Sequence, residues 1–148
     1  MKRINRKIVA LLLMVVTTFS VPLYLLATEE EAKAVAQQIA YALAERFGLT
    51  VRSTYRYGFL NEGQSSYVTT TLYQGTTYYL VAGGCSKAYD VDIIVYDENY
   101  NLIERDNDAR QVAVARVTPR WTGTFHIKIQ MYSCSDEGAH WVLLYAYK

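Results

Sequence analysis

The hydrophobic and polar positions of this chain follow three patterns in succession. Residues 8–27 form a nearly continuous apolar run, residues 28–48 repeat apolar side chains at helical spacing, and residues 49–148 form short runs rich in Thr, Tyr, Val and Ile. Apolar positions three and four apart indicate an amphipathic helix, whereas runs of β-branched and aromatic residues between Gly, Asn and Asp indicate strands and turns. The pattern therefore predicts one helix followed by a β-rich domain.

The N-terminal segment, residues 1–27, has the order of features of a secretory signal peptide. Four basic residues precede the apolar run, and Ala27 stands before a charged segment. An uncleaved membrane anchor is the alternative, because residues 8–27 are about long enough to span a bilayer. Both interpretations place the rest of the chain outside the cytoplasm, secreted or periplasmic, with membrane contact only through an uncleaved N-terminus.

Residues 28–48 predict an amphipathic helix with clear ends. Thr28 and Glu31 fit a capping box, and Gly48 follows the last apolar position. One stripe of the helix carries mostly small apolar residues: Ala32, Val35, Ala36, Ile39, Leu43 and Phe47. Because an alanine-rich stripe is shallow, we expect the helix to lie flat on an apolar surface.

Residues 49–148 predict an antiparallel, jelly-roll-like β-sandwich of about eight strands. The strand at residues 124–132 alternates apolar and polar residues, which indicates one face in water. The strand at residues 140–148 is apolar on both faces, so both faces must be covered. The predicted helix is available to cover one of these faces, and we expect it on the sheet that contains this last strand. The candidate strands span residues 49–57, 66–73, 77–83, 90–97, 101–106, 111–117, 124–132 and 140–148.

Charge excludes one class of partner. Without residues 1–27 the chain keeps 11 basic and 14 acidic residues, a net charge of −3. Nucleic-acid binding needs a clustered positive surface, so a nucleic-acid partner is not expected.

The two cysteines, Cys85 and Cys134, both fall in the exported part. In an oxidising compartment such a pair predicts a disulfide. Two free thiols are the first alternative; a zinc site is the second, although the spacing of the cysteines and histidines does not favour it.

The segment DENYNLIERDND, residues 97–108, has the acidic spacing of a calcium loop but lacks its glycine and its flanking helices. A β-hairpin fits better, because Asn and Asp are turn residues; Tyr100 stands where glycine would be easier. Asp90, Asp92 and Asp97 remain candidate calcium ligands, with solvated turn and edge residues as the alternative. We predict no cofactor and no calcium requirement for folding.

Three stretches in sequence order, LYQGTTYYLVAGG, DVDIIVYDENYNLIERD and VTPRWTGTFHIKIQ, resemble signatures of the bacterial pre-peptidase C-terminal (PPC) domain family. The resemblance covers about residues 66–148. It implies an exported, jelly-roll-like β-sandwich that serves as an accessory module beside a secreted peptidase; some relatives bind calcium and others bind extracellular polymers. No catalytic domain accompanies it here, so the resemblance implies a module that acts alone or on a separate partner.

Catalytic motifs are missing from the sequence. It contains neither G-x-S-x-G, nor H-E-x-x-H, nor a glycine-rich phosphate loop. A small hydrolase using His126 or His140 is the alternative function, and a structural envelope protein held by its N-terminus is another.

The 14 tyrosines are the main compositional oddity. Rigid amphipathic rings serve binding surfaces as well as cores. We predict a non-catalytic exported module that binds a protein or an extracellular or envelope polymer. Trp121, between Pro119 and Gly123, either covers one end of the core or contacts the partner. The candidate binding residues are Trp121, Tyr55, Tyr57 and Tyr73.

Overall fold

A computed structural model describes residues 27–148. The predicted signal peptide or anchor, residues 1–27, therefore lies outside the described residues except for Ala27. Within the described part, no helix is both long enough and apolar enough to span a membrane.

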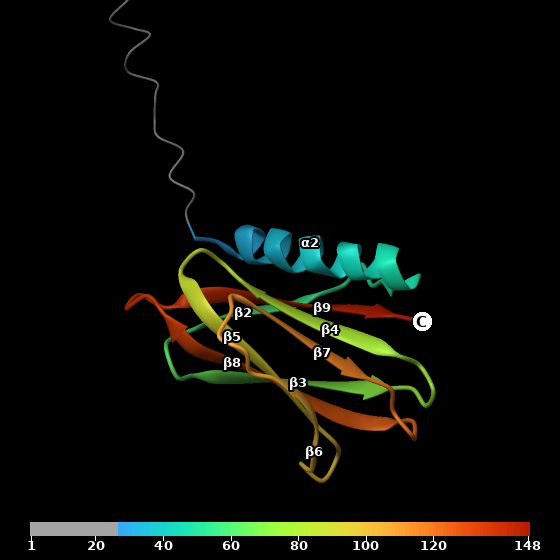
Figure 1. Cartoon of the computed structure of the whole chain (residues 1–148). Coiled ribbons are helices and arrows are strands. Elements are labelled where there is room, and N and C mark those ends of the chain that lie inside the picture. Colours follow the sequence, from blue (N-terminus) through green and yellow to red (C-terminus); the bar gives the residue numbers. More distant parts are fainter. Residues whose placement is uncertain (1–26) are drawn as a thin grey trace, which may run out of the picture.

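Residues 27–148 form one helix and two antiparallel sheets that face each other as a sandwich (Figure 1). Sheet A has the order β1-β9-β4-β7, with β2 also paired to β9, and sheet B has the order β3-β8-β5-β6. The predicted β-sandwich with one helix is confirmed. The elements are α2 (Glu29–Phe47), β1 (Thr50–Val51), β2 (Arg56–Leu60), β3 (Ser65–Leu72), β4 (Tyr78–Gly84), β5 (Ala88–Tyr96), β6 (Leu102–Asp106), β7 (Val112–Val117), β8 (Gly123–Cys134) and β9 (Ala139–Tyr147).

Helix α2 lies on the outer side of sheet A, over β4 and β9 (Figure 1). The Thr28 hydroxyl accepts a hydrogen bond from the Glu31 N–H at 3.3 Å, and Gly48 ends the helix in the left-handed conformation, as the caps predict. The residues that reach zero exposure are the alanines Ala32, Ala36 and Ala40. The helix therefore lies flat on the sheet, and the prediction that it covers the sheet of the last strand is confirmed.

Gly83 of β4 is where helix and sheet come closest. A Cβ added at Gly83 would lie 2.7 Å from the backbone nitrogen of Ala36 and 2.9 Å from the carbonyl oxygen of Ala32. Small residues on both sides thus allow backbone to approach backbone, which accounts for the shallow alanine stripe.

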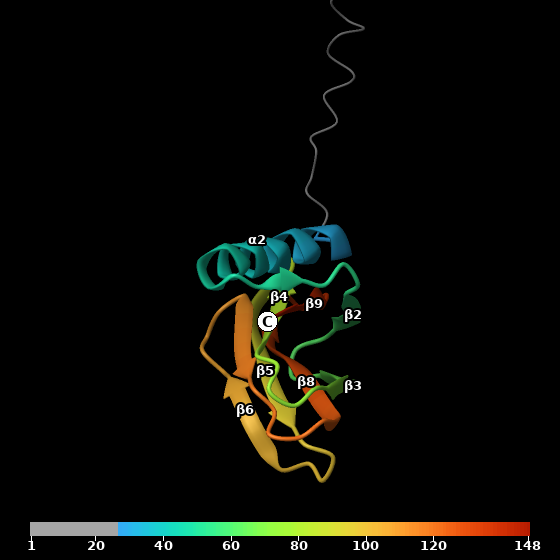
Figure 2. The same cartoon turned by 90° about the vertical axis from the view of Figure 1, so that its right-hand side faces the viewer.

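The main core lies between the two sheets. In β8, Phe125, Ile127, Ile129 and Met131 are all fully buried, while the intervening residues are partly or fully exposed. This confirms the predicted alternation. Within residues 27–148, no helix or strand lies over the outer side of sheet B, and Figure 2 shows β3, β8 and β6 on the side of the molecule opposite α2.

The first predicted strand, residues 49–57, is divided in the structure. β1 pairs with the end of β9, the pairing is interrupted after the N–H of Arg52, which still bonds to the Tyr145 carbonyl, and β2 pairs with β9 again from Arg56. The edge of the sandwich between β2 and β3 is open at this break.

The predicted hairpin joins β5 to β6. The N–H of Asp97 bonds to the carbonyl of Asn101, and the N–H of Tyr100 bonds to the carbonyl of Asp97, both at 3.0 Å. The acidic stretch is therefore a turn between two strands and not a helix–loop–helix calcium loop.

Candidate functional site

The outward side of sheet B, here called the open face, gathers side chains from four separate parts of the sequence. In the strand register, His126 of β8 lies between Thr69 of β3 and Tyr96 of β5, and Lys128 lies between Tyr67 and Ile94. The open face consists of Tyr67, Thr69, Tyr89, Ile94, Tyr96, Tyr100, His126, Lys128, Gln130 and Tyr132.

His126 occupies the centre of the open face. Its Nδ1 lies 3.0 Å from the Thr69 hydroxyl, and the ring of Tyr100 stacks on it with centroids 4.4 Å apart and planes 2° apart. The ring centroid of Tyr96 lies 6.3 Å from that of Tyr100. These contacts hold one histidine and two tyrosines in fixed positions on the surface.

Tyr100 adopts an unusual backbone conformation. Its φ is 60°, and it is the only non-glycine residue with positive φ in the described part of the chain. A bulky residue in the left-handed region costs about 1 kcal/mol or more. Such an outlier is commonly found at functional sites, and here it places an exposed ring over His126.

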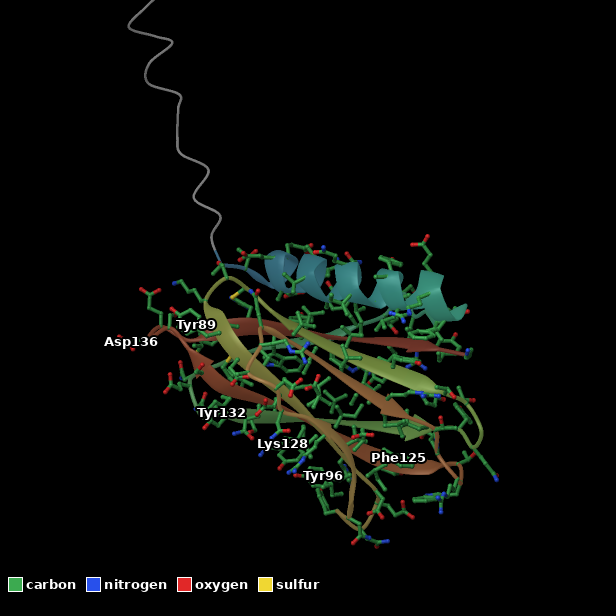
Figure 3. All side chains as sticks on the ribbon, viewed as in Figure 1. Tyr89, Tyr96, Phe125, Lys128, Tyr132 and Asp136 are labelled. Carbon is green, nitrogen blue, oxygen red and sulfur yellow. The ribbon has the colours of Figure 1, made fainter. Side chains whose placement is uncertain are left out.

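Four tyrosines of the open face, Tyr67, Tyr89, Tyr100 and Tyr132, are each more than half exposed. Tyr89 and Tyr132 stand at irregularities in the β5–β8 pairing, where the register shifts. Figure 3 shows Tyr132, Lys128 and Tyr96 one after another along the side of sheet B that faces away from the helix. None of the four is among the candidate binding residues from the sequence, because the alternation pattern of one strand does not reveal its neighbours in the sheet.

Asp97 uses its carboxylate to shape the hairpin. Oδ1 accepts hydrogen bonds from the N–H groups of Asn99 and Asn101, both at 2.8 Å, and Oδ2 accepts one from the Asn101 amide at 2.9 Å. These bonds hold the pKa of Asp97 below its usual range. Its oxygens are thus occupied by the turn.

Asp90 and Asp92 are largely buried on β5. Burial raises the pKa of Asp92, and the nearby carboxylates of Asp90 and Asp106 add to the shift while Lys128 opposes it. One oxygen of Asp90, Oδ1, is buried without a hydrogen-bond partner. Across residues 27–148, no three His, Cys, Asp or Glu side chains are arranged to hold a metal ion, so Asp90, Asp92 and Asp97 do not form one site.

Replacing Asp92 with asparagine should stabilise the protein at pH 7 by up to about 1 kcal/mol, the size of an ordinary single substitution. The folded state holds the Asp92 proton more tightly than the unfolded state, whose carboxyl has a pKa near 3.9. At a pH above this raised pKa, the ionised carboxylate of Asp92 therefore lowers the free energy of unfolding. That loss of stability disappears as the pH falls through the pKa of Asp92 in the folded state. Urea unfolding from pH 7 to pH 4 should show the advantage of Asp92→Asn shrinking; an advantage that grows toward pH 4 would contradict the assignment.

The predicted disulfide is not present. Cys85 and Cys134 are both free thiols buried in the core. The sulfur of Cys85 accepts the N–H of His140 at 3.3 Å, and burial raises the pKa of the Cys134 thiol. Both side chains pack as small apolar groups, a common role of free cysteine. Their strand ends do share one end of the sandwich, since Ala88 pairs with Cys134 and donates its N–H to the Cys85 carbonyl.

Trp121 covers one end of the core. Its ring stacks on the fully buried Phe125 at 5.5 Å, and its Nε1 donates a hydrogen bond to Glu98 at 3.2 Å. Beside it lies an apolar pocket of about 230 Å³ that Ile103 and Pro119 also line. Of the two roles expected for Trp121, this geometry corresponds to covering one end of the core.

The three candidate tyrosines lie apart from the open face. The Tyr55 hydroxyl donates to Glu29 of α2 at 3.1 Å, Tyr57 is exposed on β2 at 5.9 Å from the Tyr55 ring, and Tyr73 is exposed in the turn after β3. Tyr55 thus ties the helix to the β1–β2 connection, and the three do not form one surface.

Both candidate histidines pack against aromatic rings. None of the hydrogen bonds in residues 27–148 joins His126 to a carboxylate. The ring of His140 packs edge-on against Phe59 at 5.0 Å. A general base normally has a partner that orients it, as well as a nucleophile or a water molecule within reach.

No family model matches this sequence, and no curated protein shows significant similarity to it. Among solved structures, the chain is similar to Aeromonas hydrophila PliG, a periplasmic lysozyme inhibitor of g-type lysozyme: the identity is 18%, the TM-score is 0.49, and the match covers 66% of this chain and 88% of that one.

Proposed function

We propose that this chain is an exported, non-catalytic β-sandwich that binds another protein through the open face. The observation that carries the proposal is the asymmetry of the sandwich: sheet A is covered by α2, whereas sheet B presents an uncovered surface with four tyrosines more than half exposed. Tyrosine supplies a large contact area with little conformational freedom to lose, and it is enriched in protein interfaces.

The fixed arrangement at the centre supports the same function. Tyr100 keeps an unfavourable backbone conformation while its ring lies parallel to His126. Side chains held in place before binding lose less entropy in the complex, so a surface of this kind binds more tightly than a mobile one.

A paired substitution tests the proposal. The full chain is immobilised and incubated with the exported protein fraction of its own cells, and the partner retained at moderate salt is quantified. The double variant Tyr67→Ser/Tyr132→Ser should reduce retention at least about tenfold, because central interface tyrosines often contribute more than 1 kcal/mol each. Its melting temperature should stay close to that of the parent, since both side chains are exposed.

The matched control is Tyr41→Ser/Tyr57→Ser, which removes two equally exposed tyrosines from α2 and β2. It should retain the partner like the parent chain. Loss of retention in the control, with none in the open-face variant, would contradict the proposal and move the binding surface to the helix side. If retention survives protease digestion of the fraction, the partner is a polymer other than protein, and the proposal of a protein partner is contradicted.

A further inference from the structure

The edge of the sandwich between β2 and β3 contains a small polar pocket that adjoins the open face at Thr69. It opens where the pairing with β9 is interrupted between β1 and β2, and it is lined by Arg52, Arg56, Thr54, Thr69, Thr70 and the buried Tyr145. The pocket is small, with a volume of about 30 Å³.

Two guanidinium groups stand at this pocket without an acidic partner. The salt bridges of residues 27–148 join other residues, so Arg52 and Arg56 have no carboxylate partner within the described part of the chain. The nearby acid, Glu29, accepts the hydroxyl of Tyr55. The pocket therefore has a positive charge that nothing in the described residues neutralises.

Arg52 is held in position by Tyr145. The backbone N–H of Arg52 donates to the Tyr145 carbonyl at 2.8 Å, and its guanidinium lies over the Tyr145 ring, 5.0 Å from the centroid. Tyr145 of β9 lines the pocket together with Thr70 of β3, so both sheets contribute to it. Burial raises the pKa of the Tyr145 hydroxyl, so this group stays protonated and remains a donor at neutral pH. The pocket thus combines two arginines with hydroxyl groups from both sheets.

We infer that Arg52 and Arg56 form a binding site for a single carboxylate group. A guanidinium binds a carboxylate through two parallel hydrogen bonds, and a small pocket suits the planar carboxylate group better than a bulkier tetrahedral anion. The carboxylate belongs to a free small acid or to an acidic side chain of a bound peptide. The site adjoins the open face and shares Thr69 with it, but it does not depend on the function proposed for that face.

Titration of the full chain, labelled with ¹⁵N, tests the site through the arginine Nε–H resonances at constant ionic strength. Acetate represents a free acid, and acetyl-glutamate amide represents an acidic side chain. Saturable shifts of Arg52 and Arg56, with a dissociation constant on the order of 10 mM or below, are expected for at least one of the two. Shifts with acetate alone identify a small free acid as the ligand, and shifts with both identify a side-chain carboxylate as a ligand too.

Arg56→Gln and Arg116→Gln make a matched pair. Arg56 is exposed, so its replacement should leave the melting temperature nearly unchanged and weaken acetate binding about tenfold. Arg116 also lies over a tyrosine, 5.8 Å from the Tyr79 centroid, but away from the pocket, and its replacement should leave binding unchanged. Shifts that rise linearly with concentration, that chloride or phosphate reproduces, or that persist in Arg56→Gln would overturn the inference.

Discussion

Replacing Gly83 with alanine is expected to destabilise the protein by about 3 kcal/mol, the upper part of the range for an overpacked core. The added Cβ would meet the Ala36 nitrogen at 2.7 Å and the Ala32 carbonyl oxygen at 2.9 Å. Both are backbone atoms of α2 that no rotamer change can move away. The helix must therefore rise from sheet A, and contacts along the whole alanine stripe weaken together. Thermal unfolding should show a melting temperature lower by roughly 10 °C.

Gly63→Ala is the control for the loss of a glycine without a clash. Gly63 has a φ of 75°, and an added Cβ there meets no atom within 4 Å. Its replacement should lower the free energy of unfolding by roughly 1 kcal/mol, which is the cost of the left-handed backbone conformation for a residue with a Cβ. Equal losses for the two variants would contradict close helix–sheet packing as the reason that residue 83 is glycine.

Replacing Trp121 with alanine is expected to cost about 2–3 kcal/mol, somewhat less than for a fully buried tryptophan because the ring is half-buried. The ring covers Phe125, which has zero exposure, and its removal would admit water to the end of the core. Urea unfolding measures the loss directly, and retention of the partner by the folded variant should be unchanged.

Trp121→Phe separates packing from hydrogen bonding. Phenylalanine keeps a ring against Phe125 but cannot donate to Glu98, so less than half of the alanine loss is expected. If Trp121→Ala instead kept its full stability and abolished retention of the partner, Trp121 would belong to the binding surface, the second role considered for it from the sequence.

The features that the sequence predicted correctly depend on neighbours along the chain. Thr28 and Gly48 bound the helix because capping involves residues three or four positions apart. The alternation in β8 fixed which side chains enter the core, because successive side chains in a strand point to opposite faces. Because β9 is apolar on both faces, the sequence also predicted that the helix covers the sheet that contains this strand, which is sheet A. The resemblance to the PPC domain family remains a prediction that no comparison tests.

Two predictions failed or fell short because they depended on distance between remote segments. Cys85 and Cys134 reach the same end of the sandwich, but both thiols are free in the core. The candidate binding tyrosines Tyr55, Tyr57 and Tyr73 lie on separate parts of the surface.

The sequence by itself determined the helix, most of the strands and the buried side of β8, because these follow from the 3.6-residue and two-residue periods of the backbone. Only the tertiary structure decided which strands are neighbours. Strand order in the sheets, β3-β8-β5-β6 and β1-β9-β4-β7, brings His126 between Thr69 and Tyr96 and brings Arg52 over Tyr145. Those pairings join residues separated by 30 to 93 positions, where no local period operates, so the open face and the arginine pocket exist only in the folded chain.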